Sequence, residues 1–180
     1  EIAEKFLNGE DVDSILIYET IRKLTIENKI VPVLCGSSFK NKGVQPLLDA
    51  VSRYLPSPVD RGEITGHNHK DFEKMITRGP NPEEPFSALA FKIFRDSYIG
   101  TITFTRIYSG QIKQGQSIFN PISKKKEKIT KILRMHANKK EELGFAYAGD
   151  IVALVGPKFT RTGETLCIEQ KQIIYDLMNF

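Results

Sequence analysis

The spacing of apolar residues divides the chain into a helical first part and a strand-rich second part. After Asp13, which can cap a helix, apolar residues recur at helical spacing up to Leu24, and they do so again over 46–55. Between these helices, the apolar and β-branched run 29–35 predicts a buried strand, which a glycine-bounded polar loop at 36–43 follows. The first part therefore predicts a strand, a loop and a helix, preceded by a further helix.

Beyond residue 85 the apolar period changes to two, which predicts short strands. The predicted strands are 86–94, 101–108, 116–120, 129–135 and 150–155, and turn signals separate them about every 8 to 15 residues. This spacing is typical of an antiparallel barrel or sandwich, and we favour a closed barrel because so short a domain must hide its sheet edges. Alternation along the strands favours a place in the barrel core, rather than a base-stacking role, for five aromatic residues: Phe91, Phe94, Phe104, Tyr108 and Phe119.

The stretch 56–85 is different in composition from both neighbours. It holds five prolines and three glycines but few large apolar residues. So long a stretch without a clear period is uncommon within one compact domain and indicates a connection between domains.

Composition and charge place the chain among globular proteins with a basic second half. Of 180 residues, 40% are hydrophobic and 27% are charged, and there is no apolar run of 18 residues. The first residue is Glu1 rather than Met, so we expect a soluble fragment that begins within a longer chain. Residues 1–85 carry a net charge of −3 and residues 86–180 a net charge of +7, which suits phosphate-rich partners for the second half.

The cysteines and histidines predict neither a disulfide nor a metal site. Cys35 and Cys167 lie 132 positions apart and are expected to be buried thiols in a reducing compartment. His67 and His69 have no cysteine or carboxylate cluster beside them, so we expect a solvated pair in a loop.

Several long motifs together resemble elongation factor G, a translational GTPase, and they cover almost the whole chain. They lie at 32–51, 54–58, 84–92, 108–110, 135–138, 148–151 and 162–166. The resemblance implies an α+β fragment: the C-terminal strand and helices of an α/β P-loop GTPase domain, followed by an antiparallel β-barrel of the translation-protein type. It assigns 1–58 to the GTPase domain with the end of its inserted subdomain, 59–85 to a linker, 86–172 to the barrel and 173–180 to the next linker.

The resemblance also implies a function for the parent protein. Elongation factor G uses GTP, with Mg²⁺, to drive movement of tRNA and mRNA through the ribosome in the cytoplasm. The expected partners are small-subunit rRNA and the remaining domains of the same chain, with no membrane, and the protein is expected to be a monomer. The alternatives are release factor 3, a ribosomal protection protein, or a free-standing RNA-binding barrel; a translocase and a recycling paralogue both remain open.

The resemblance places the family's fifth guanine-nucleotide motif at Gly36, Ser37 and Ser38, with Ser38 where the family has Ala. A tight loop after a strand can direct a backbone N–H at the guanine O6, although such a loop by itself is an ordinary strand-to-helix connection. The sequence has no phosphate-binding Gly-x-x-x-x-Gly-Lys-Ser/Thr and no guanine-reading Asn-Lys-x-Asp. We therefore expect no catalytic residue, metal ligand or measurable GTP binding in this fragment alone.

A second candidate site is the run of Lys124, Lys125, Lys126 and Lys128. The run lies between two predicted strands and is interpreted as a hairpin connection, for which solvated charge is the ordinary explanation. The resemblance implies that these lysines contact rRNA phosphates. It gives three weaker candidates for the same contact: Arg134, Lys139 and Lys140.

Overall fold

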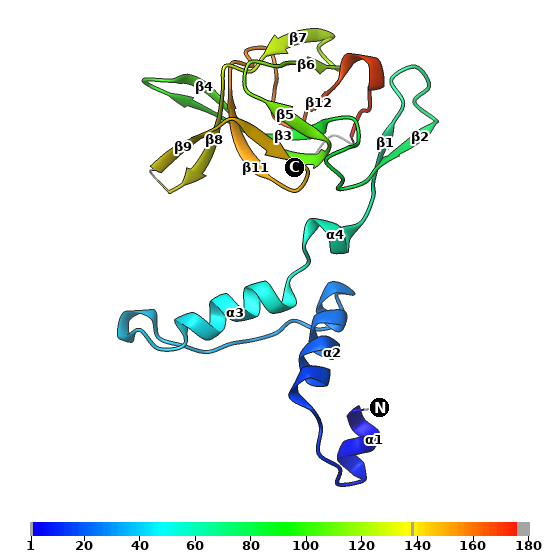
Figure 1. Ribbon diagram of the computed structural model, residues 1–180, viewed down its shortest axis with the longest axis vertical. Coiled ribbons are helices and arrows are strands. Elements are labelled where there is room, and N and C mark those ends of the chain that lie inside the picture. Colours follow the sequence, from blue (N-terminus) through cyan, green and yellow to red (C-terminus); the bar gives the residue numbers. More distant parts are fainter. Residues whose placement is uncertain (1, 138, 176–180) are drawn as a thin grey trace. The chain divides into compact units, whose positions relative to one another are not determined.

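A computed structural model describes residues 2–137 and 139–175. The chain forms two compact units, Glu1–Ser57 and Pro58–Phe180 (Figure 1).

The first unit is helical. It contains α1 (Ile2–Leu7), α2 (Ser14–Ile26), the 3-10 helix η1 (Ser38–Lys40) and α3 (Val44–Tyr54). Asp13 caps α2 as expected, because its carboxylate accepts the Ile15 N–H at 3.0 Å. The Arg22 guanidinium joins α2 to α3 by donating to the Arg53 carbonyl at 2.8 Å. Ala50 is the one buried residue in the described part of this unit.

The strand predicted at 29–35 does not form, and this prediction was wrong. Val31 is 84% exposed and Val33 90% exposed, and the described backbone has no regular structure between residues 30 and 36. A strand is stable only when a neighbour satisfies its backbone groups, and this unit provides none beside the run. Cys35, expected to be buried, is exposed for the same reason.

The second unit is built from antiparallel strands. It begins with the helix α4 (Pro58–Arg61) and the hairpin of β1 (Ile64–His67) and β2 (Met75–Arg78). The remaining elements are β3 (Ser87–Asp96), β4 (Gly100–Ser109), β5 (Gln111–Lys113), β6 (Ser117–Asn120), β7 (Lys125–Lys128), β8 (Lys131–His136), β9 (Lys139–Leu143), β10 (Phe145–Tyr147), β11 (Ile151–Val155), β12 (Thr165–Cys167) and the 3-10 helix η2 (Glu169–Lys171). Eight strands pair in the order β7-β6-β12-β3-β4-β11-β8-β9, and β10 pairs with β5. The result is the barrel-like sheet that the sequence predicts (Figure 1).

The core inside this sheet is mostly aliphatic. Its buried residues are Phe86, Ala88, Ala90, Ile107, Ile112, Ile118, Ile129, Ile132, Ala146, Val152, Leu154 and Leu166. The five aromatic residues expected in the core are not among them, but Phe104, Tyr108 and Phe119 are partly buried and pack against two further buried clusters, so the expectation holds only in part. On β4, buried Thr103, Thr105 and Ile107 alternate with partly exposed neighbours, which places Phe104 and Tyr108 on the opposite face. The interior of so small a barrel is filled by aliphatic side chains.

The segment expected to be a linker, 59–85, contains regular structure. In the β1–β2 hairpin, Ile64 and Ile76 pack against the buried cluster of Leu89, Cys167, Ile173 and Tyr175 on the outside of the barrel. The hairpin also meets the end of the described chain, because His67 and Ile174 exchange two backbone hydrogen bonds of 2.7 and 2.9 Å. Of the second expected linker, residues 176–180 lie outside the described residues.

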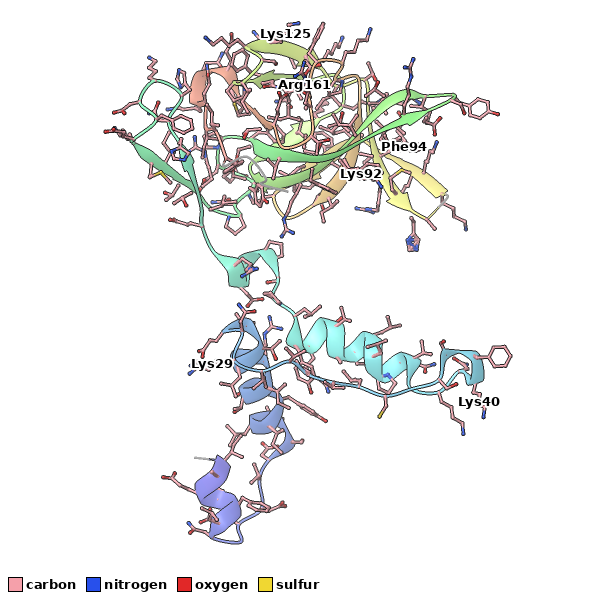
Figure 2. The ribbon with its side chains drawn as sticks, turned by 180° about the vertical axis from the view of Figure 1, so that it is seen from behind. Lys29, Lys40, Lys92, Phe94, Lys125 and Arg161 are labelled. Atoms are coloured by element: carbon pink, nitrogen blue, oxygen red, sulfur yellow. The ribbon has the colours of Figure 1, made fainter. Side chains whose placement is uncertain are left out.

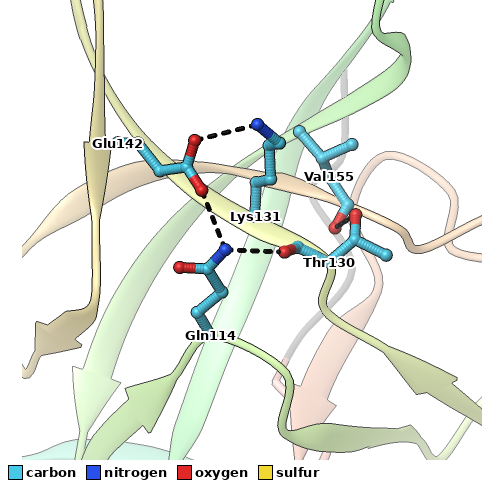
Figure 3. Close-up of polar contacts among 5 residues, drawn as sticks. All are labelled: Gln114, Thr130, Lys131, Glu142 and Val155. Carbon is cyan, nitrogen blue, oxygen red and sulfur yellow. Dashed lines mark hydrogen bonds and ion pairs between the residues drawn. The ribbon is translucent and has the colours of Figure 1, made fainter.

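Polar contacts hold the β8–β9 hairpin against its neighbours. Glu142 on β9 accepts hydrogen bonds from Lys131 at 2.9 Å and from Gln114 at 2.8 Å, and Gln114 also donates to the Thr130 carbonyl (Figure 3). Elsewhere on β9, Lys140 forms an ion pair of 2.5 Å with Asp96, the last residue of β3. The hairpin is therefore joined both to the turn before β6 and to the end of β3.

The Asp96 ion pair predicts an acid-dependent contribution to stability. The hydrogen bond from Lys140, followed by the N–H groups of Tyr98 and Ile99, lowers the Asp96 pKa from 3.8 to about 2. The lowered pKa applies to the folded state only. The stabilisation that the Asp96 carboxylate provides is therefore complete above about pH 4 and is lost as the pH falls through about 2. We expect the stability difference between the wild type and Asp96→Asn to disappear over this range in urea unfolding at stepped pH. A difference that stays constant down to pH 2 would contradict this assignment.

Candidate functional site

Two close backbone approaches shape the loop at Gly36, Ser37 and Ser38. Ser37 and Lys42 exchange backbone hydrogen bonds of 2.9 and 3.0 Å, which closes the loop at its base. A Cβ on Gly36 would lie 2.8 Å from the Lys42 carbonyl oxygen, so only glycine fits there. Gly43 faces Gly36 and has a positive φ of 75° as it caps α3. The two glycines therefore determine the shape of this loop.

The loop presents backbone donors beside a small hollow. Ser38 begins η1, and the first N–H groups of a helix have no acceptor within it. A hollow of about 230 Å³ adjoins the loop and is lined by Leu34, Cys35, Gly36, Ser37, Ser38, Lys42, Gly43, Val44 and Leu47. The arrangement can form one edge of a pocket for a planar base.

The lysine run is a strand rather than the expected hairpin connection. Residues 125–128 form β7, which pairs with β6 from Ser117↔Lys128 to Asn120↔Lys125. The turn lies earlier, at 121–124, where Asn120 accepts the N–H groups of Ile122 and Ser123 at 3.0 Å each. The buried Asn120 side chain holds the turn. Pairing with β6 makes β7 the edge strand of the sheet.

The four lysines are all exposed, but their surroundings differ. Lys126 forms an ion pair of 2.6 Å with Glu169, whereas the Lys125 ammonium lies 3.5 Å from the centroid of the Phe159 ring. Among the described residues, Lys124 and Lys128 have no ion-pair partner. Lys124, Lys125 and Lys128 are therefore better placed than Lys126 to bind an added anion.

Glu127, between these lysines, points the other way and is buried. Its carboxylate accepts the backbone N–H groups of Lys158 and Phe159, the latter at 2.8 Å, and the Thr160 hydroxyl. A buried carboxylate needs such donors to offset its lost hydration. Glu127 thereby fixes the loop 156–164 against β7.

The weaker candidates occupy the β8–β9 hairpin instead. Arg134 lies 3.5 Å from Glu141, and Lys140 is held by Asp96. These two cations have carboxylate partners, so they are less available to phosphates than the lysines of β7. Lys139 is exposed at the start of β9.

Sequence reasoning missed the loop that packs beside the lysine strand. Lys158, Phe159 and Arg161 are exposed on it, some 30 residues beyond β7 in the chain. The sequence does contain one signal for this packing, which is Glu127, the single acidic residue within the lysine run. An acidic side chain in such a place can be buried and hold a neighbouring segment. Only the pairing of β7 brings the two segments together.

Cys35 lines the hollow beside Gly36, whereas Cys167 and His67 lie outside both sites. Burial raises the pKa of the Cys167 thiol to about 11, so it stays protonated at neutral pH. His67, expected in a loop, lies in β1, and its ring stacks on Phe72 at 4.1 Å. Among the described residues there is no group of three or more His, Cys, Asp or Glu that could hold a metal ion. No helix in that part of the chain is both long and apolar enough to cross a membrane.

Comparisons with known proteins agree with the fold of the second unit. Residues 100–167 match the family model of elongation factor Tu domain 2. A crystal structure of a protein from Thermus thermophilus matches 94% of this chain and 23% of its own, with a TM-score of 0.66 at 23% identity. At that identity the likeness shows the fold alone. Together with the family-model match it confirms the predicted β-barrel of the translation-protein type.

A match in sequence is more specific than this likeness in structure. All 180 residues align at 51% identity with elongation factor G 2 of Desulfotalea psychrophila, and they cover 26% of that protein. The chain thus spans about a quarter of the length of this relative. The match confirms the resemblance drawn from the motifs: this chain is an elongation factor G homologue along its whole length.

Proposed function

We propose that the chain belongs to a cytoplasmic translational GTPase that moves tRNA and mRNA through the ribosome, and that its barrel is a ribosome-contacting module. The observation that carries this proposal is the row of exposed lysines on β7, in a chain 51% identical to an elongation factor G. A basic strand at a sheet edge suits the phosphates of small-subunit rRNA. The chain acts as a monomer together with the other domains of the same protein.

In this proposal the first unit contributes to nucleotide binding in the whole protein. Gly36, Ser37 and Ser38 form one edge of the guanine pocket and offer a backbone N–H to the base. One or two such hydrogen bonds contribute about 0.5–1.5 kcal/mol each, far less than the roughly 8 kcal/mol of micromolar binding. GTP and Mg²⁺ are therefore held by the rest of the parent, which supplies the phosphate loop and GTPase chemistry.

The barrel contributes no chemistry of its own and works as a rigid arm. Three separate hydrophobic clusters pack the described part of the second unit, including one on the outside under the β1–β2 hairpin. Close packing of this kind resists deformation, so a displacement at one end of the arm reaches the other. This property suits a module that passes nucleotide-dependent changes from the GTPase domain to the ribosome.

Replacing Lys124, Lys125, Lys126 and Lys128 by Gln tests the proposal. Ribosome binding of the full-length protein should weaken, and the logarithmic salt slope should flatten by on the order of 0.7–0.9 for each phosphate that is no longer bound. Stability should change by less than about 0.5 kcal/mol, because these charges are exposed. Binding is measured by sedimentation with ribosomes at several salt concentrations.

A charge-matched variant controls for the general loss of positive charge. It carries Gln at four exposed lysines elsewhere in the second unit: Lys70, Lys74, Lys113 and Lys171. This variant should keep most of the affinity and salt slope. If both quadruple variants lose the same affinity, β7 is not the ribosome contact.

A further inference from the structure

One exposed ring stands among the cations around β7. Phe159 is 52% exposed, and the ammonium of Lys125 lies 3.5 Å from its ring centroid. Lys158 and Arg161 flank Phe159 on the same loop and are exposed. Figure 2 shows Lys125 and Arg161 at the same end of the barrel. We call Lys124, Lys125, Lys128, Lys158, Phe159 and Arg161 the cation–aromatic surface.

Buried acids hold the backbone beneath this surface at two points. Glu127 accepts the N–H groups of Lys158 and Phe159. Glu164 accepts the Arg161 N–H at 2.8 Å and the Asn120 amide at 2.7 Å. Both carboxylates are buried, so the loop that carries Phe159 is tied to β7 and to the turn before it. A contact surface fixed before binding loses little conformational entropy when a partner arrives.

An aromatic ring within a set of cations matches the chemistry of an unpaired nucleotide. Every base has a π-face that can stack on a phenyl ring, while the phosphates on either side need positive charge. A regular duplex offers phosphates but keeps its bases stacked inside, so it cannot use the ring. The Lys125 ammonium sits on a flexible stem and can move from the ring to a phosphate as a base arrives.

We propose that Phe159 stacks on an unpaired base of RNA, whose flanking phosphates are bound by Lys124, Lys125, Lys128, Lys158 and Arg161. The inference rests on the proposed function, since it deepens the contact between the barrel and rRNA. It adds a recognition element that lysines alone cannot provide, namely a preference for unpaired over paired nucleotides. Phe159 is the residue that gives the surface this preference.

The test uses the 180-residue chain and a 5′-labelled single-stranded RNA of about 12 nucleotides, within the usual site size for such binding, with the same RNA annealed to its complement as the duplex probe. Phe159→Leu should weaken single-strand binding by roughly 5- to 150-fold in fluorescence anisotropy, the loss expected for one base–aromatic stack. Its salt slope should not change, because no charge is removed. Duplex binding should stay the same, and Phe159→Trp should restore single-strand binding.

The matched control is Phe145→Leu. Phe145 is 47% exposed, and it also lies beneath a lysine, with the Lys113 ammonium 5.4 Å from its ring centroid. Its loss should leave binding of both RNAs unchanged. Melting of each variant by circular dichroism shows whether the barrel stays folded, and Phe159→Trp keeps the test valid if Phe159→Leu is unstable.

The outcomes separate this inference from the proposed function. If Phe159→Leu binds the single strand as well as wild type does, or the wild type does not prefer single strands, the stacking role is wrong. The lysine variants can still reduce ribosome binding in that case, and the proposed function then stands. If the lysine variants leave ribosome binding unchanged while Phe159→Leu loses single-strand binding, the ribosome contact fails and the stacking surface remains.

Discussion

Gly156→Ala is expected to lower the free energy of unfolding of the barrel by roughly 2–5 kcal/mol. Gly156 follows β11 with a φ of 122°, which residues with a side chain rarely adopt. An added Cβ would lie 2.2 Å from the Lys128 carbonyl oxygen and 2.9 Å from the Thr130 nitrogen. Both are backbone atoms, one in the last residue of β7 and one just before β8, so the clash cannot be relieved by turning a side chain.

Gly115→Ala is the matched control for this substitution. Gly115 also has a positive φ, of 84°, but an added Cβ there would meet nothing within 4 Å. Its cost should be the backbone strain alone, about 1–2 kcal/mol. Urea unfolding followed by far-ultraviolet circular dichroism measures both variants. An equal loss of stability in the two would show that the contact with Lys128 does not restrict this position.

Hydrogen exchange should reveal a difference of several orders of magnitude in amide protection between the two units. The described part of the first unit buries Ala50 alone, whereas the second unit buries three hydrophobic clusters. Amides that open only by global unfolding are protected by the full stability of their domain, while those of a poorly packed helix open locally. Strands β3, β4 and β11 should therefore exchange slowly, and α2 and α3 quickly.

The experiment requires a concentration at which the chain is monomeric. Exposed apolar residues on α3 and in the run 29–35 favour association, which would protect the first unit artificially. A dilution series by mass spectrometry controls for this effect. Equal protection in both units at the lowest concentration would refute the expectation.

Local signals predicted much of the barrel, but the faces of its strands were harder to infer. Five expected strands correspond to β3, β4, β6, β8 and β11, because each is long enough to show alternation or β-branched enrichment. The short strands β5, β10 and β12 are three residues each, too short for a period to be read. Phe91 and Tyr108 lie at shifts in the register between β3 and β4, at Ala90/Lys92 and Ser87/Ala88, and such shifts change which face a side chain occupies.

The sequence by itself determined the family, the capped helix α2 and the barrel class, since these depend on motifs and on neighbours close in the chain. It also predicts both candidate sites. Tertiary structure decided the rest. It left the run 29–35 unpaired, because a strand requires a partner that local sequence cannot supply. It also made the lysine run an edge strand, and through Glu127 it brought Phe159 and Lys125 together from segments more than 30 residues apart. Such contacts depend on long-range pairing and burial, which no local pattern encodes.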